Sequence, residues 1–520
     1  MEESKEHCGL VGIYLKKPNS ALLYKLLLQG LYGLQHRGQE GSGAYILSSD
    51  GLTLIRREDG PVERLFEDGS LARQIDNKSP IIGLGHTRYS TSGDPDANQP
   101  FSSADFILVH NGNITNARKL AKKINTPLSK NFQSDTDIFF KYLLSSKGRS
   151  IETRIRHALE NTEGAANFII ISPANRQLFA YRDPWGFHPL ILGEIPQHGY
   201  IVASENNFFS NAGVNMIREI APGEGITIDD NRVKTFFIDD RKKSKRNQNG
   251  IPTARCIFEQ IYFAAPDSYF FKHSVAQTRR TLGACLAQDD IKAGFFPEVT
   301  IPIQHSGNIY VEGYAQAMIS YVAQHWQKLG INKDQLGDYI NTFIPKAGLI
   351  ANYAARRVFI HPTDRNGRAS LKHRPDPHVV AGKKVVIIDD SIVRSTTIKE
   401  IVKALRKAKA EQIHVRVGCP PIIAPCFMGI DFPNSDDLIA NRCKGNIEKM
   451  RQEIGCNSLR FVSHKQLITA ANGLHELKGT TPGMLYKHAG FCGACFTNNY
   501  PTGINTSGVF SKSCQYNPKN

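Results

Sequence analysis

The sequence predicts two domains of different class, an α+β domain up to about residue 230 and an α/β domain after about residue 250. The chain has 520 residues, more than one hydrophobic core usually organises. In the first part, short strand-like runs are broken by Gly, Asn and Asp turns. In the second part, apolar strands alternate with helical stretches, a pattern typical of βαβ units and a parallel sheet.

The individual elements follow from the hydrophobic period, which is two residues in a strand and 3.6 in a helix. In the first part we expect strands over Gly9–Tyr14, Ile81–His86, Phe106–His110, Asn167–Ile171 and Gly199–Ser204, and helices over Ala21–Leu34 and Asp135–Leu144. In the second part we expect helices over Val275–Gln288 and Tyr314–Leu329, and strands over Val299–Ile303, Val385–Ile388 and His414–Val417. From about Met484 the chain is rich in Cys, Gly and Asn, which predicts irregular structure.

Composition and charge exclude several classes of protein. Hydrophobic residues make up 41% and charged residues 22%, which is too apolar for a disordered chain. No apolar run reaches the roughly 18 residues of a membrane span, and Met1–His7 does not resemble a secretory signal. The ten thinly spread cysteines suit reduced thiols in a cytoplasm. The net charge of +16 lies partly in the basic segments Asp239–Gly250 and Asp364–His378. The first of these lacks interleaved aromatics, which favours a solvated linker over a nucleic-acid site.

Cys8 is a candidate N-terminal nucleophile, because it stands near the start of the chain and directly before a predicted strand. This chemistry would require removal of residues 1–7 as a propeptide. The freed α-amine, with a pKa near 8, could then act as general base for the thiol of the same residue.

Four further segments supply groups that amide hydrolysis by a thiol needs: QHRGQEGSG from Gln35, GHTRYSTS from Gly85, HNGN from His110 and SDTD from Ser134. Asn111 and Gly112 offer N–H donors for an oxyanion. Arg88 can bind an α-carboxylate as a bidentate fork, and Asp135 can hold an α-ammonium. Together these groups suit a free amino acid with an amide side chain, namely glutamine.

With RDPWGFHPL from Arg182 and ASEN from Ala203, these segments resemble the glutamine amidotransferases of the N-terminal-nucleophile class. The resemblance implies a four-layer αββα domain that releases ammonia from glutamine. It also places Arg37 among the glutamine-binding residues. His188 departs from this family, which usually has Arg there, and we expect the change to affect packing or a domain contact.

A second site is predicted at Val385–Thr397, VVIIDDSIVRSTT, where an apolar strand delivers Asp389 and Asp390 to its carboxyl end. The following loop offers backbone N–H groups and hydroxyls to a phosphate, with a helix N-terminus behind it. The two carboxylates suit ribose hydroxyls or Mg²⁺.

This segment resembles the phosphoribosyl-diphosphate loop of type I phosphoribosyltransferases. Together with CIFEQIYFAAPDS from Cys256 and PPIIAPCFMGID from Pro420, it makes the chain resemble the amidophosphoribosyltransferase family. The resemblance implies that ammonia passes internally to C1 of phosphoribosyl diphosphate, giving 5-phosphoribosylamine in the first committed step of purine synthesis. It assigns the substrate to Asp389, Asp390, Ser391, Arg394, Ser395, Thr396 and Thr397, Mg²⁺ to Ser306, Asp389 and Asp390, and coupling of the sites to Tyr262.

Several positions depart from the family pattern where a charged side chain or close backbone approach is expected. His305 replaces an Asp, Asn341 and Ala265 each replace an Arg, Val358 falls at a family Lys, and Ser395 replaces a loop Gly. Each lost charge-assisted hydrogen bond is worth roughly 1.5–3 kcal/mol, so these changes could weaken substrate binding. They leave open a paralogue that is a glutaminase with a regulatory nucleotide-binding or phosphoribosyl-binding domain. The further hypothesis of a nucleic-acid binder built on this scaffold is supported only by the two basic loops.

Four cysteines match the ligand positions of the iron–sulfur subgroup of this family: Cys256, Cys426, Cys492 and Cys495. Four thiolates suit a [4Fe-4S] cluster, and zinc is the chemical alternative. The resemblance further implies feedback by purine nucleotides and a homotetramer or homodimer. The expected domains are the propeptide 1–7, the amidotransferase domain 8–238, a basic linker 239–250, the phosphoribosyltransferase domain 251–483 and a segment with cluster cysteines, 484–520.

Overall fold

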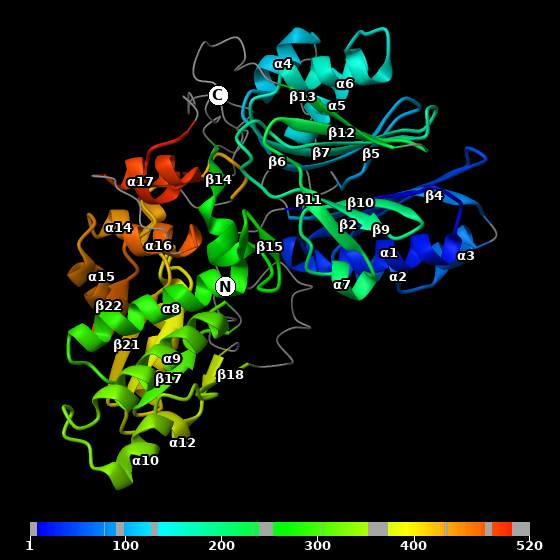
Figure 1. The fold of residues 1–520 in the computed structure, drawn as a ribbon. Helices are drawn as coiled ribbons and strands as arrows, with labels where there is room; N and C mark the ends of the chain where they lie inside the picture. The colour runs from blue at the N-terminus through cyan, green and yellow to red at the C-terminus, as the bar shows by residue number, and fades with distance from the viewer. Residues whose placement is uncertain are drawn as a thin grey trace.

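The structure is a computed structural model, and it describes residues 8–76, 78–89, 98–125, 134–230, 232–238, 253–304, 306–351, 373–430, 432, 435–473 and 481–501. Figure 1 shows a layered first half beside a second half built around a smaller sheet. Residues 1–7, the basic segment 239–250 and most of the basic segment 364–378 lie outside the described residues.

The first half contains a seven-stranded sheet with the strand order β11-β9-β10-β1-β4-β2-β3. Its strands are β1 Gly9–Leu15, β2 Gly41–Ser48, β3 Thr53–Asp59, β4 Pro80–Arg88, β9 Ile191–Ile195, β10 Gly199–Ala203 and β11 Asn215–Glu219. β1 pairs antiparallel with β10 and β4 and is buried over its whole length. One face carries α1 Ser20–Gly33, with α2 Glu63–Phe66, α3 Ser70–Ile75 and α7 Phe209–Ala212 nearby.

A six-stranded sheet of order β13-β12-β8-β7-β6-β5 lies against the first one (Figure 1). Its strands are β5 Phe101–Ser102, β6 Ile107–Ile114, β7 Gly164–Ser172, β8 Gln177–Tyr181, β12 Glu224–Ile228 and β13 Val233–Phe237. Its outer face carries α4 Ala117–Lys123, α5 Asp135–Ser145 and α6 Ile151–Glu160. Tyr14 and Leu84 of one sheet share a buried cluster with Val109 and Ile169 of the other. The expected αββα architecture is therefore confirmed.

The second half is built on a parallel sheet of order β17-β20-β21-β22, which confirms the expected α/β domain. The strands are β17 Val299–Pro302, β20 Lys384–Asp389, β21 Gln412–Val417 and β22 Ser458–Phe461. The helices are α8 Val275–Lys292, α9 Asn308–His325, α10 Leu336–Asn341, α12 Pro377–Val380, α13 Thr396–Lys407, α14 Ile439–Arg442, α15 Ile447–Ile454 and α16 His464–Ala471. Short pairs β15 Tyr269–Phe270 with β16 His273–Ser274, and β18 Leu349–Ala351 with β19 His373–Pro375, complete it.

The end of the chain differs from the expected irregular structure. The described part holds α17 Pro482–Ala489, β23 Phe491–Cys492 and α18 Ala494–Thr497. Thr481 caps α17 by accepting from the Met484 N–H, and Gly490 ends it with φ +70°. β23 pairs in parallel with β14 Arg255–Cys256, which ties this segment to the start of the second half. The cause is local: a cap and a left-handed Gly delimit a helix too short to show a period.

Helix α9 differs from its predicted bounds, Tyr314–Leu329. It begins six residues earlier, because Tyr310 and Val311 also belong to the core, and it ends at His325. Among the described residues, no helix is long and apolar enough to cross a membrane.

Candidate active sites

Cys8 lies directly before β1, where hydrogen bonds from three segments fix the backbone. The Gly9 N–H donates to Thr87 Oγ1 at 3.1 Å, and Thr87 Oγ1 donates to the Leu34 carbonyl at 3.2 Å. The Cys8 thiol itself donates to the carbonyl oxygen of Tyr89, with 3.8 Å between the heavy atoms. The thiol is thereby held at the end of β4, beside Arg88.

The thiol is not activated by its surroundings alone. Burial raises the pKa of Cys8, and the nearby charge of Asp135 adds to this, while Arg88 and Arg37 lower it without reversing the rise. A thiol with a raised pKa is protonated at neutral pH and needs a base to become a nucleophile. The α-amine that removal of residues 1–7 would free is the base that the sequence predicts; residues 1–7 lie outside the described residues.

Asn111 and Gly112 occupy adjacent positions of β6, as an oxyanion site would require. The Asn111 side chain is 1% exposed, and neither its Nδ2 nor its Oδ1 has a hydrogen-bond partner among the described residues. A buried amide without a partner costs stability unless a ligand uses it. Gly112 has φ +140°, and a Cβ there would lie 2.0 Å from the Ala165 carbonyl oxygen. Only glycine fits this position.

Arg88 and Asp135 are both buried, at 6% and 7% exposure, and the charge of each acts on the Cys8 thiol. Arg88 ends β4 and donates from Nη1 to Asn98 Oδ1 at 3.2 Å. Asp135 begins α5, and its Oδ2 accepts from the Ile114 N–H at 2.8 Å. The structure therefore brings a cation and an anion together near the thiol, as the sequence predicted.

Arg37 has a different environment from the one expected of a glutamine ligand. Its guanidinium is fully buried, pairs with Glu205 and donates to both carboxylate oxygens of Glu259, at 3.0 and 2.8 Å. Its Nε donates to the Cys8 carbonyl oxygen at 3.2 Å. Burial lowers the pKa of this guanidinium, but Glu259 and Glu205 outweigh that and raise it. Because its N–H donors are engaged by Glu205, Glu259 and the Cys8 carbonyl oxygen, Arg37 orients Cys8. This geometry does not support a direct contact between Arg37 and glutamine.

His188 stands where the family usually has Arg, and a change in packing or in a domain contact was expected there. The structure shows a contact between the two halves. The ring is fully buried, with Nδ1 3.1 Å from Glu259 Oε1 and Nε2 3.0 Å from the Met428 carbonyl oxygen. His188 belongs to the first half, and both partners belong to the second. Glu259 therefore contacts two residues of the amidotransferase half, Arg37 and His188.

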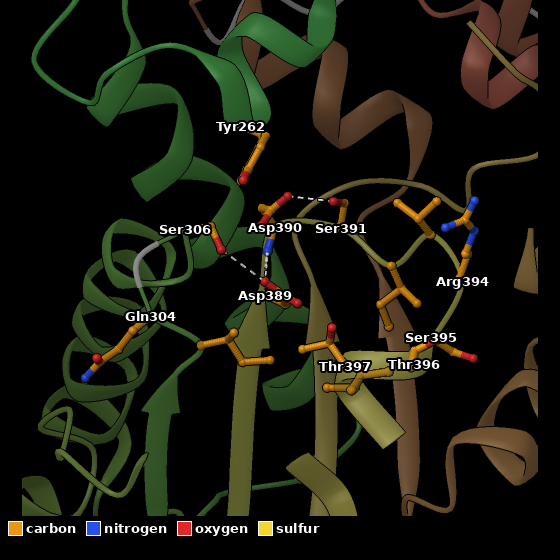
Figure 2. A pocket seen from close by; sticks show the side chains of 14 residues that line it. Tyr262, Gln304, Ser306, Asp389, Asp390, Ser391, Arg394, Ser395, Thr396 and Thr397 are labelled. Atoms are coloured by element: carbon orange, nitrogen blue, oxygen red, sulfur yellow. Dashed lines mark hydrogen bonds between the residues drawn. The ribbon is translucent and has the colours of Figure 1, made fainter. Parts of the chain in front are cut away.

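A pocket lies at the carboxyl end of β20, and Figure 2 shows its lining side chains. Asp389 Oδ1 accepts from Ser306 Oγ at 3.1 Å and from the Asp390 N–H at 3.0 Å. Ser391 Oγ donates to Asp390 Oδ2 at 2.6 Å. All the predicted substrate residues line this pocket, and so do Tyr262, Gln304 and Ser306.

The pocket is dominated by its two carboxylates. Burial and the neighbouring Asp390 charge raise the pKa of Asp389, and burial raises that of Asp390. Of the described residues lining the pocket, Arg394 is the only Lys or Arg. Two adjacent carboxyls, Asp390 buried and Asp389 half-buried, are stabilised by a cation. This is the setting in which Mg²⁺ binds through one or two carboxylates and substrate phosphates.

Tyr262 lies in a π-helical turn, Glu259–Phe263, that reaches from one site to the other. Its side chain lines the pocket at Asp389–Thr397, while Glu259, three residues earlier, pairs with Arg37, which in turn donates to the Cys8 carbonyl oxygen. Sequence reasoning assigned no role to Glu205 or Glu259. The detectable signal was an isolated acidic residue in an apolar run, as in CIFEQIYF, because such a carboxylate needs a buried partner.

The four cysteines Cys256, Cys426, Cys492 and Cys495 line one cavity at the junction of the halves, together with His188 and Tyr500. The Met428 N–H donates to Cys426 Sγ at 3.3 Å. Burial raises the pKa of all four thiols. Among the described residues, no three His, Cys, Asp or Glu side chains form a group that could hold a single metal ion.

Comparison with known proteins agrees with this arrangement. The sequence model of the glutamine amidotransferase domain family matches residues 86–211. The chain is 34% identical to amidophosphoribosyltransferase 2, chloroplastic, of Arabidopsis thaliana, over 96% of this chain and 80% of that protein. It is 33% identical to the amidophosphoribosyltransferase of Bacillus subtilis, over 96% and 95% of the two chains.

The chain belongs to the amidophosphoribosyltransferase family. The solved glutamine phosphoribosylpyrophosphate amidotransferase of B. subtilis, complexed with ADP and GMP, superposes with a TM-score of 0.77 at 31% identity and covers 96% of this chain and 99% of its own. A second structure, described as the allosteric regulatory enzyme of purine biosynthesis, has a TM-score of 0.78 at 30% identity, with 97% and 98% covered.

Five positions of this chain differ from the pattern of the amidophosphoribosyltransferase family, and three of them lie in described parts of the chain. Ser395 has φ +74°, a conformation that glycine adopts without strain. Ala265 leaves no side-chain charge, and its N–H donates to Glu205 Oε2 at 2.8 Å. Asn341 ends α10. His305 and Val358 lie outside the described residues.

Proposed function

We propose that this protein is a glutamine-dependent amidophosphoribosyltransferase, which makes 5-phosphoribosylamine and pyrophosphate from glutamine and phosphoribosyl diphosphate. The observation that carries the proposal is that one chain holds both a buried Cys8 site and an Asp389–Thr397 phosphate pocket, with Glu259 and Tyr262 on the turn between them. The reaction is the first committed step of purine synthesis.

At the first site, the α-amine of Cys8, once freed, takes the thiol proton, and Sγ attacks the side-chain amide carbon of glutamine. Asn111 Nδ2 and the Gly112 N–H stabilise the oxyanion that forms. The protonated amine then gives its proton to the leaving nitrogen, which departs as ammonia, and water hydrolyses the thioester to glutamate. Arg88 holds the α-carboxylate and Asp135 the α-ammonium. Arg37 positions Cys8 through the Cys8 carbonyl oxygen and Glu259, and does not act as a glutamine ligand.

At the second site, ammonia attacks C1 of the ribose, and the C1–O bond to pyrophosphate breaks. Ser391, Thr396, Thr397, the backbone of Ser395 and the N-terminus of α13 bind the 5-phosphate, with Arg394 beside them. Asp389 and Asp390 bind the ribose hydroxyls. Mg²⁺ bound near Asp389, Asp390 and Ser306 would neutralise charge on the leaving pyrophosphate. Internal passage of ammonia keeps it unprotonated and therefore nucleophilic.

The four cysteines are proposed as ligands of a [4Fe-4S] cluster. Four thiols around one cavity, one of them already accepting a backbone N–H, suit such a cluster chemically. When bound, the cluster would connect three segments: β14, the loop that holds Cys426, and the segment Cys492–Cys495. Equal amounts of iron and acid-labile sulfide in anaerobically purified protein would support it; zinc without sulfide would contradict it.

Three finer proposals come from the family. Purine nucleotides act as feedback inhibitors, as suggested by the ADP and GMP in the B. subtilis structure. The protein is a homotetramer or homodimer. It acts in the cytoplasm and needs no membrane or nucleic acid.

The decisive experiment measures pyrophosphate release, first with glutamine and then with ammonium salts. Release with both is expected. Because Arg394 is the only cationic residue among the described lining of the pocket, the rival is a glutaminase whose second domain only binds a regulatory ligand. Glutamine hydrolysis without pyrophosphate release from either nitrogen source would favour that rival.

A further inference from the structure

Ser395 stands at a strained point of the phosphate loop. Its φ of +74° places it in the left-handed region, directly before the first residue of α13, and it is 4% exposed. A side chain at such a position costs free energy that glycine would not, so the conformation must be held by surrounding contacts. Figure 2 shows its hydroxyl directed away from Asp389 and Asp390.

The contacts that hold it come from α14 and α15. Ser395 Oγ donates to Glu453 Oε1 at 3.4 Å, and Arg442 Nη2 donates both to Ser395 Oγ at 3.4 Å and to the Arg394 carbonyl oxygen at 3.0 Å. The Ile439 N–H donates to the Val393 carbonyl oxygen at 3.0 Å. Three consecutive loop residues, Val393 to Ser395, are thus attached to one neighbouring segment.

Glu453 is the centre of this cluster. Its Oε1 lies 2.7 Å from both Lys399 Nζ and Arg442 Nη2, and its Oε2 accepts from the Cys443 thiol at 3.3 Å. Partial burial raises the pKa of Glu453, but hydrogen bonds from Lys399, Arg442 and Cys443 prevail and hold it at about 2. The carboxylate is therefore ionised at any working pH, and it joins the loop, α13 and α14.

We infer that Glu453 and Arg442 are positioning residues that hold Ser395 in its left-handed conformation and so shape the phosphate loop for its ligand. The inference rests on the proposed transferase function for its ligand, but the loop geometry can be measured without it. Neither residue lines the pocket, so both act through Ser395 and the loop backbone.

The test variant is Glu453→Gln, with Glu448→Gln as matched control. Glu448 lies on the same helix, but its partners are Arg451 and Gln452 of that helix. With ammonium salts as nitrogen source, we expect Glu453→Gln to raise KM for phosphoribosyl diphosphate about tenfold, with kcat within about twofold. The direction of the change in KM is diagnostic. If only charge mattered, removing a negative charge near a polyphosphate site would strengthen binding and lower KM. An unchanged or lowered KM would overturn the inference.

A double-mutant cycle that combines Glu453→Gln with Ser395→Gly is the second test of the inference. Glycine adopts φ +74° without strain, so Glu453→Gln should change KM by less than about twofold in the Gly background. An undiminished effect there would show that Glu453 acts elsewhere. Amide hydrogen exchange over residues 391–397 should accelerate in Glu453→Gln and not in Glu448→Gln, and equal exchange would contradict the inference. If the wild type neither bound phosphoribosyl diphosphate nor released pyrophosphate, the proposed function would fail, and the exchange arm would still decide this inference.

Discussion

The two sites differ in how much of their chemistry the chain supplies itself. Around Cys8, the proposed nucleophile, lie a cation at Arg88, an anion at Asp135 and the buried Asn111 amide, which has no hydrogen-bond partner among the described residues. The pocket at Asp389–Thr397 instead presents two adjacent carboxylates and, within its described lining, one arginine. A net charge of +16 is thus not concentrated where a polyphosphate would bind. We infer that the first site holds its own charged partners for an amino-acid substrate, whereas the two carboxylates of the second site would need a bound cation for charge balance.

The largest effect should separate the two sites completely. Replacing Cys8 with Ala removes the nucleophile, so glutamine-dependent pyrophosphate release should fall on the order of 10⁴-fold or more, while release with ammonium salts persists. Cys285→Ala, at a half-buried cysteine outside both sites, is the control. Loss of ammonia-dependent release in Cys8→Ala would mean that the thiol also serves the second site.

Asn111→Ala tests the unpartnered amide. If Asn111 stabilises the oxyanion, kcat for glutamine hydrolysis should fall about 10²- to 10³-fold with KM for glutamine little changed. The alternative is that the amide only fills space, in which case the variant would gain stability by losing an unsatisfied buried group and would keep its kcat. Steady-state kinetics and thermal unfolding of the same preparation distinguish the two.

Asp389→Asn tests whether the second site depends on its acidic pair. Pyrophosphate release with ammonium salts should fall about 10²-fold, because the variant loses a carboxylate that the metal and ribose use. Raising Mg²⁺ should recover part of the activity, which loss of the fold would not allow. Activity equal to the wild type at low Mg²⁺ would show that the pocket binds its ligand without this carboxylate.

Local patterns predicted the fold well, and distant pairings were not predictable. β1, β4 and β20 appear within a few residues of their predicted bounds, because strand alternation and apolar runs are local properties. Cys8, Asn111 and Asp389 were found because each stands in a distinctive short segment. The Arg37–Glu259 pair joins residues 222 positions apart, and no pattern in either segment announces the partner. The contact between Ser395 and Glu453 is similarly set by the packing of α13 against α15.

The last prediction concerns one buried histidine in each half of the chain. Burial and Arg88 lower the pKa of His86 in β4 from its ordinary 6.5 to about 3, and burial and Arg416 lower that of His414 in β21 to about 4. Because the unfolded chain binds these protons more readily, stability is full above pH 6.5 and is lost as pH falls toward the folded pKa. For His86 the loss between pH 6.5 and pH 4 should be about 3 kcal/mol. Urea unfolding of His86→Asn and His414→Asn at both pH values should show a flatter acid dependence in each. Between pH 4 and pH 3 the flattening should be larger in His86→Asn, because folded His414 is already about half protonated at pH 4.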